Sequence, residues 1–166
     1  MRAWTSFFVL FTFIACDAKE SGDDSGAFGG GSDEELAEAL WAAIDGFQDW
    51  PQPTEWDGVL ASADGTHGNF IQIFGDSDTL AAVSAGSAIP DGGILVKCGF
   101  DAVDGTIEDD CTLTAMQKVS GYDADHGDWF WAKFDLATGD VQLSGQVSGC
   151  FGCHTDLDSD SDFVLY

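Results

Sequence analysis

The sequence predicts a mainly β domain of the α+β class, an antiparallel sheet preceded by one amphipathic helix. Two observations support this class. Short runs rich in β-branched and aromatic residues recur along the chain and are separated by Gly, Asp and Asn, as is typical of strands and turns. One segment before them carries apolar residues at helical spacing. With 166 residues, 45% of them hydrophobic, the chain is long enough for one domain with a substantial core.

The helix is predicted directly after a change in composition at Ser32. The letters SDEE place Ser32 and Glu35 three residues apart, which is the spacing of a capping box. Apolar residues follow at helical spacing: Leu36, Leu40, Ile44 and Phe47. Pro51 and Pro53 should end this helix after about four turns.

The strands are predicted in order over residues 69–74, 93–100, 111–119, 128–135 and 140–147. A short helix over 78–86 should lie between the first two, and the letters DLATGD (135–140) should form a hairpin turn. The final letters DFVLY are expected to form a last strand that closes the sheet.

Residues 1–15 have the pattern of a secretory signal rather than of a fold. Arg2 precedes an apolar run that is too short to span a bilayer. The run ends in the letters FIAC, which resemble the lipobox of bacterial lipoproteins, so Cys16 is the predicted lipidation site. An ordinary signal peptide with a chance cysteine is the alternative. Residues 16–31 then form a flexible acidic, Gly-rich tether, and residues 32–166 form the domain. We therefore expect an exported bacterial lipoprotein of the periplasm or cell envelope that is held at the membrane by its lipid alone.

The charge excludes some partners. The formal net charge is −25, with five Lys and Arg against 30 Asp and Glu. Such a surface repels nucleic acid and anionic lipid but could attract a basic redox partner protein. Solubility, or adaptation to a salty habitat, is the alternative explanation.

The cysteines fall into three groups. Cys16 is assigned to the lipid. Cys98 and Cys111 flank an acidic, Gly-containing stretch, and a strand–loop–strand there would bring them into bonding range, so they are the predicted disulfide. Cys150 and Cys153 remain, with His154 directly after them.

The spacing C-x-x-C-H at residues 150–154 indicates attachment of one c-type haem. Each thiol can add to a vinyl group, and the adjacent imidazole can reach the iron, so His154 is the predicted proximal ligand. A zinc site would need a further ligand cluster, and a thioredoxin-like pair would normally open a helix in a βαβ unit. A structural disulfide would make no use of His154.

Three further stretches carry the resemblance to a known family. They are LTAMQKVSGYDADHGDWFWAKFD (113–135), GQVSGCFGCH (145–154) and DFVLY (162–166). Together they resemble the cytochrome P-460 family, which includes the beta-type cytochromes c prime, and the resemblance covers about residues 36–166. It implies a mainly β, often dimeric fold with one covalent haem c, bound by Cys150, Cys153 and His154, and with an open sixth position on the iron.

The resemblance implies two activities. Cytochromes P-460 oxidise hydroxylamine with a haem that is also cross-linked to a lysine, whereas the beta-type cytochromes c prime lack the link and bind nitric oxide in an apolar pocket. Lys97 is the candidate for the cross-link; its alternative role is an outward-facing strand residue that pairs with nearby acids. If the family's cross-link falls earlier, around residues 75–90, this chain has no lysine for it.

Four aromatic residues are candidates for the distal pocket, although a plain core role is their alternative: Phe70, Phe74, Phe100 and Trp129. His67, His126 and Met116 could each supply a sixth ligand, and the protein would then be a six-coordinate electron carrier. The tail DLDSDSD (156–162) lacks the glycine and glutamate of a calcium loop. A structural lipoprotein whose C-x-x-C pair is only a disulfide is the third reading.

Overall fold

The computed structural model describes residues 31–63, 65–155, 162 and 164. Within them a six-stranded antiparallel sheet runs in the order of the sequence, from β1 to β6. The strands are β1 (Leu60–Ala61), β2 (Phe70–Gly75), β3 (Ile94–Phe100), β4 (Thr112–Lys118), β5 (Trp129–Phe134) and β6 (Val141–Gly145). The mainly β, α+β class predicted from the sequence is confirmed. The signal, the lipidation site Cys16 and the tether lie outside the described residues.

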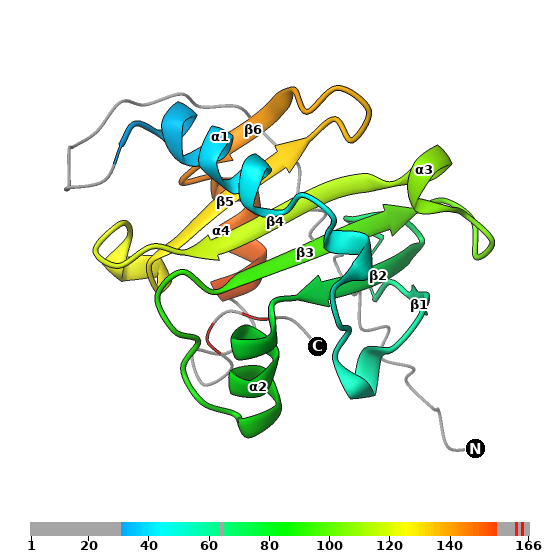
Figure 1. Ribbon diagram of the computed structural model, residues 1–166, viewed down its shortest axis with the longest axis horizontal. Helices are drawn as coiled ribbons and strands as arrows, with labels where there is room; N and C mark the ends of the chain where they lie inside the picture. Colours follow the sequence, from blue (N-terminus) through cyan, green and yellow to red (C-terminus); the bar gives the residue numbers. More distant parts are fainter. Residues whose placement is uncertain (1–30, 64, 156–161, 163, 165–166) are drawn as a thin grey trace, which may run out of the picture.

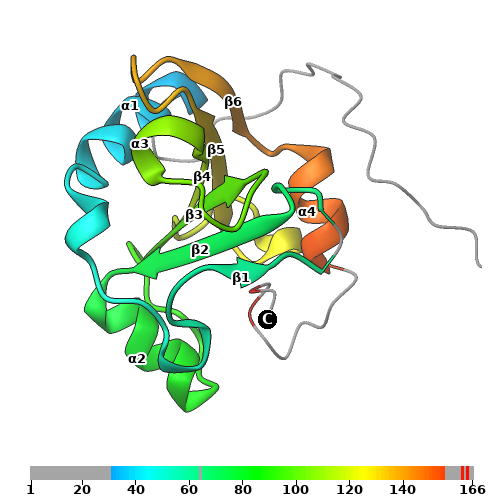
Figure 2. The same ribbon diagram turned by 90° about the vertical axis from the view of Figure 1, so that its right-hand side faces the viewer.

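Helices cover the two faces of the sheet. They are α1 (Asp33–Ala43), α2 (Ser77–Ala85), the short α3 (Ile107–Asp110) and α4 (Ser148–Thr155), with 3-10 turns η1 (Phe47–Asp49), η2 (Thr54–Trp56) and η3 (Ala124–His126). Helix α1 and helix α4 lie on opposite sides of the sheet, as Figures 1 and 2 show together. No helix among the described residues is long and apolar enough to cross a membrane.

Alternation along the strands divides the core into two layers. One layer packs against α1 and contains Leu40, Phe74, Val96, Cys98 and Phe130 among others. The other faces α2 and α4 and contains Ile73, Leu95, Met116, Trp129 and Trp131. Neighbours in the sequence therefore belong to different layers, as Lys97 and Cys98 do.

Helix α1 begins as predicted and ends earlier than predicted. The Ser32 hydroxyl accepts from the Glu35 backbone N–H at 3.3 Å, and the Glu35 carboxylate accepts from the Ser32 N–H at 2.7 Å. The helix stops at Ala43 because Gly46 adopts the left-handed conformation, with φ 71°. Phe47 therefore lies in η1, where it still reaches the core and packs edge-on against Phe74 at 5.3 Å.

The described parts of the C-terminal segment form no strand. Asp162 is a turn residue, and its backbone carbonyl accepts from the Trp129 indole at 2.9 Å. Its carboxylate forms an ion pair with Lys118 and accepts from the Ile89 N–H at 2.7 Å. The predicted last strand, DFVLY, otherwise lies outside the described residues, as does most of the acidic tail.

Asp76 joins three elements at the junction of β2, α2 and β3. Its carboxylate caps α2 through the backbone N–H groups of Asp78 and Thr79, and it also accepts from the Thr79 hydroxyl at 2.6 Å and the Ile94 N–H at 2.7 Å. Burial raises the pKa of this carboxyl, but the four donors outweigh burial and hold the pKa below its ordinary value.

We expect Asp76→Asn to lower the free energy of unfolding by about 1–2 kcal/mol at neutral pH, because the cap and the bond to Ile94 weaken. Since the folded-state pKa is depressed, the wild-type advantage should be complete above the unfolded pKa of 3.8 and disappear as the pH falls through the lower folded value. Urea denaturation of both proteins across this range measures the difference. A difference that grew on acidification would contradict the assignment.

Candidate haem site

The C-x-x-C-H motif lies on helix α4, which the sequence did not predict. Residues Ser148–Thr155 form this helix, with Cys150, Cys153 and His154 at positions i, i+3 and i+4. Side chains at these spacings share one face of a helix, so both sulfurs and the imidazole are brought to one side. His154 is buried, with 6% of its surface exposed.

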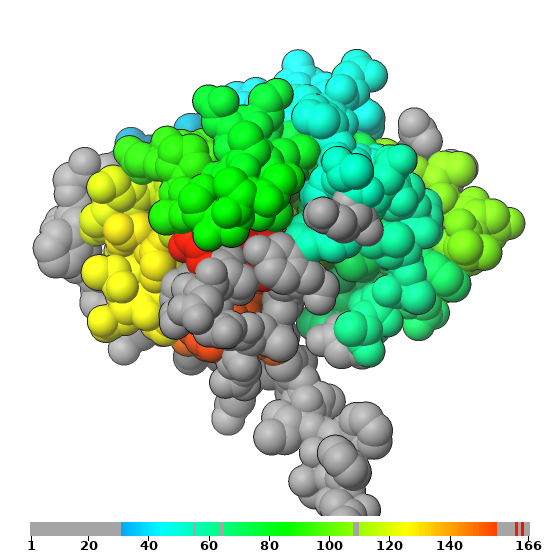
Figure 3. Space-filling view, turned by 90° about the horizontal axis from the view of Figure 1, so that it is seen from below, coloured from blue at the N-terminus to red at the C-terminus, as the bar shows by residue number. Residues whose placement is uncertain are grey.

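A partly open pocket lies between this helix and the sheet. The sheet contributes two neighbouring cross-strand rows, with Ile73, Lys97 and Thr114 in register in one and Leu95, Met116 and Trp131 in the other. Cys150 and His154 line it from α4, and Val164 contributes from the C-terminal segment. The lining is almost entirely apolar, with Lys97 as its charged member. Figure 3 shows this end of the molecule, where α2 (green), the turn near residues 120–128 (yellow) and α4 (orange) reach the surface together.

The His154 ring is held by aromatic contacts. Its centroid lies 4.6 Å from that of Trp131 in an edge-on arrangement and 6.5 Å from that of His67. Next to this face of the helix, Phe151 stacks on His126 at 4.0 Å, and the His126 Nδ1 lies 2.8 Å from the Asp123 carboxylate. His126 is half-buried, and its contact with Phe151 helps to fix α4.

The thiol of Cys150 is free and half-buried. Burial raises its pKa to about 11, partly offset by the positive charge of Lys97, so the thiol is protonated at neutral pH. Cys153 is disulfide-bonded in this structure. A thioether at the Cys153 sulfur therefore requires that bond to be reduced first.

Lys97 is not an outward-facing edge residue. Strand β3 pairs with β2 and β4, and the half-buried Lys97 lies on the face that lines the pocket. Lys118 and Lys133 share this face by register, since Lys97 pairs with Thr114 and Thr114 with Lys133. The lysines among the described residues are thus all on the pocket side of the sheet.

The structure places three of the four aromatic candidates away from the pocket. Phe70, Phe74 and Phe100 pack in the layer beneath α1, which is the core role that was their alternative. Trp129 belongs to the pocket-side layer, 6.3 Å from Trp131, but does not line the pocket. Trp131 lines the pocket instead, and only the strand register reveals it.

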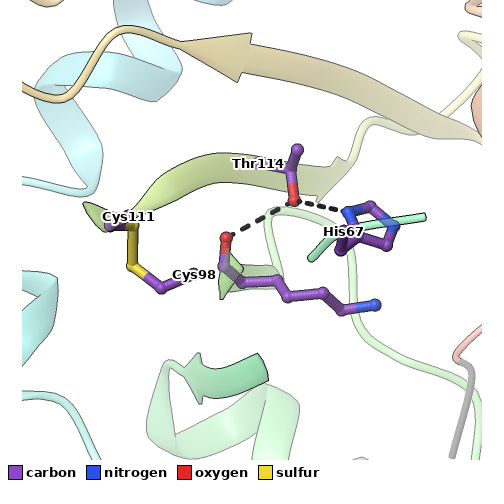
Figure 4. The surroundings of a disulfide bond; sticks show 5 residues. His67, Cys98, Cys111 and Thr114 are labelled. Atoms are coloured by element: carbon purple, nitrogen blue, oxygen red, sulfur yellow. Dashed lines mark hydrogen bonds between the residues drawn. A yellow bond between two sulfur atoms is a disulfide. The ribbon is translucent and has the colours of Figure 1, made fainter. Parts of the chain in front are cut away.

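Cys98 and Cys111 form a disulfide with a Cα–Cα distance of 5.0 Å. Figure 4 shows it together with Thr114, whose hydroxyl donates to the Lys97 carbonyl at 3.4 Å and lies 3.5 Å from the His67 ring nitrogen Nδ1. The disulfide lies in the layer beneath α1, whereas His67 and Thr114 lie on the pocket side. It therefore joins β3 to the start of β4 behind the pocket without entering it.

The residues of this site fit a haem on three grounds. Two cysteine sulfurs and one imidazole come from a single helical face, the pocket beside them is apolar, and the buried indole nitrogen of Trp131 in its wall has no hydrogen-bond partner. Among the described residues, no cluster of three or more His, Cys, Asp or Glu side chains could hold a bare metal ion.

A match to a known protein family agrees with a haem at this site. No curated protein matches the chain. The family model described as Cytochrome P460 matches residues 45–166, which is most of the chain and includes every strand, the pocket and α4. The chain therefore belongs to the cytochrome P460 family of haem cytochromes.

Proposed function

We propose that this protein is an exported mono-haem c-type cytochrome that binds or oxidises small nitrogen compounds. In this proposal Cys150 and Cys153 hold the haem covalently, His154 is the proximal ligand, and the sixth position of the iron stays open. The observation that carries it is the burial of His154 against an apolar pocket, on the same helical face as the two sulfurs.

The chain contributes position and exclusion of water. When bound, haem supplies an iron centre that takes a small ligand and exchanges one electron. Trp131 restricts the rotation of the His154 ring, and the stack of Phe151 on His126 fixes the helix. Ile73, Leu95 and Met116 offer no hydrogen bond to water, so a small neutral molecule such as nitric oxide competes well for the pocket.

Lys97 distinguishes the two activities of the family. Its place in the pocket wall supports a covalent link between a lysine and the haem, and so hydroxylamine oxidation. Without such a link, the apolar pocket supports capture of nitric oxide. A ferrous Soret band far to the red in the wild type, and an ordinary one in Lys97→Met, would establish the linked form.

A six-coordinate electron carrier is the second candidate. Met116 lines the pocket, and the His67 ring lies 6.5 Å from that of His154. If either residue bound the iron, the spectrum would be low-spin, and Met116→Leu or His67→Ala would convert it to high-spin.

Localisation and partner are also proposals. The apolar N-terminal run and the cysteine after it support export and lipid anchoring. The net charge of −25, together with the placement of the described lysines on the pocket side, supports a basic partner protein.

We expect the matured protein, produced in a bacterium that attaches haem c, to give a c-type pyridine haemochrome with one haem per chain. The ferrous protein should be five-coordinate and high-spin, and nitric oxide should change its spectrum. The double variant Cys150→Ala/Cys153→Ala, in which the two predicted attachment sulfurs are removed, should lose its haem on acid-solvent extraction. Colourless, iron-free wild-type protein would contradict the proposal, and a low-spin ferrous spectrum would favour the carrier.

A further inference from the structure

Trp131 carries a polar group that the described chain does not satisfy. Its indole Nε1 is buried and has no hydrogen-bond partner, and the residue as a whole is only 4% exposed. The indole N–H can only donate, and buried donors in folded proteins almost always find an acceptor. Trp131 lines the pocket beside His154, so a group that fills this pocket is the candidate acceptor.

The position of Trp131 limits what this acceptor can be. Its ring packs edge-on against His154, with centroids 4.6 Å apart. Trp131 therefore lies on the side of the proximal imidazole, whereas a small molecule on the iron would bind on the opposite side. An iron-bound ligand is thus poorly placed to accept from Trp131.

Haem brings few acceptors of its own. Its four ring nitrogens are bound to iron and most of its edge is hydrocarbon, so the two propionate carboxylates are the acceptors at its perimeter. We propose that the Trp131 indole N–H donates a hydrogen bond to a haem propionate and so fixes how the haem is turned on helix α4. This inference rests on the proposed attachment of haem at Cys150 and Cys153.

Charge in the pocket supports the same assignment. Lys97 lines the pocket, and its positive charge is felt at the Cys150 thiol. A cation near a carboxylate favours the ionised form, and an ionised acceptor makes the stronger hydrogen bond with an indole N–H.

Trp129 provides a matched control. It lies on the same strand and the same face, 6.3 Å from Trp131 between ring centroids. Its indole N–H already donates to the Asp162 carbonyl at 2.9 Å. The two tryptophans therefore differ in whether the protein itself satisfies the N–H.

The test compares Trp131→Phe and Trp129→Phe as matured, haem-loaded proteins. We expect Trp131→Phe to shift the propionate bending band in the resonance Raman spectrum. It should also raise the pH at which the reduction potential responds to propionate titration, because the ionised carboxylate loses a donor. Trp129→Phe should leave both measurements as in the wild type.

Unchanged Raman and potential data in Trp131→Phe would overturn the inference. If that variant does not fold, a crystal structure of the haem-loaded wild type decides instead: Nε1 should lie about 2.9 Å from a propionate oxygen, and a water or protein acceptor in that place would overturn the inference. A haemochrome assay on the wild type comes first. Colourless wild-type protein would refute the proposed function, whereas a coloured wild type with an insensitive Trp131 would refute only this inference.

Discussion

His154→Ala should retain covalent haem but lose the native axial ligand. The two sulfurs of α4 are unaffected by the substitution, so the haemochrome should still report c-type haem. The ferric and ferrous spectra should change, and added imidazole should restore them in part. Removal of a residue that hydrogen-bonds a metal ligand typically lowers metal affinity or activity by about 10–100-fold. We therefore expect loss of the ligand itself to lower any hydroxylamine oxidation by more than about 100-fold.

His126→Ala is the control for this result. His126 belongs to η3, and its ring stacks on Phe151 of α4. Its Nδ1 lies close to the Asp123 carboxylate. Its loss should cost about 1 kcal/mol of folding free energy and leave the spectrum native. A native spectrum in His154→Ala, or a lost one in His126→Ala, would contradict the ligand assignment.

The strands were predictable because their local signals agree with the sheet. Each predicted run overlaps an observed strand to within one or two residues, and α2 is displaced from its prediction by one. Helix α4 gave no such signal. It contains Gly149 and Gly152, which disfavour a helix, and its position depends on packing against the sheet. Strand β1 has two residues, too few for a pattern.

The site was only partly predictable for a related reason. The motif identifies Cys150 and His154 through chemistry that needs no structure. Which residues face them depends on the parity of each strand position, and alternation alone does not say which face α1 covers. From the sequence, Phe74 and Phe100 were therefore as good candidates for the pocket wall as Trp131, but their side chains pack beneath α1.

The second large effect concerns the close contact between Gly99 and the loop that carries His67. A Cβ built on Gly99 would lie 1.3 Å from the His67 carbonyl oxygen. The clash is between a Cβ, which is fixed to the backbone of residue 99, and the backbone carbonyl of His67. Rotation of a side chain therefore cannot relieve it. The loop beside β3 would have to move away, and the His67 ring near Thr114 and His154 would move with it.

We expect Gly99→Ala to lower the free energy of unfolding by about 3 kcal/mol or more, at the upper end of the range for overpacking. Gly75→Ala is the matched strand control, since the three atoms nearest to its Cβ would be side-chain atoms of Leu80 and Leu95, the closest at 2.7 Å. Those side chains can turn aside, so about 1 kcal/mol is expected there. Denaturation of the two haem-loaded variants measures both. Because the Gly99 clash also displaces His67, only Gly99→Ala should alter the ligand-binding spectrum; equal stabilities and unchanged spectra would show that the loop does not rest on β3.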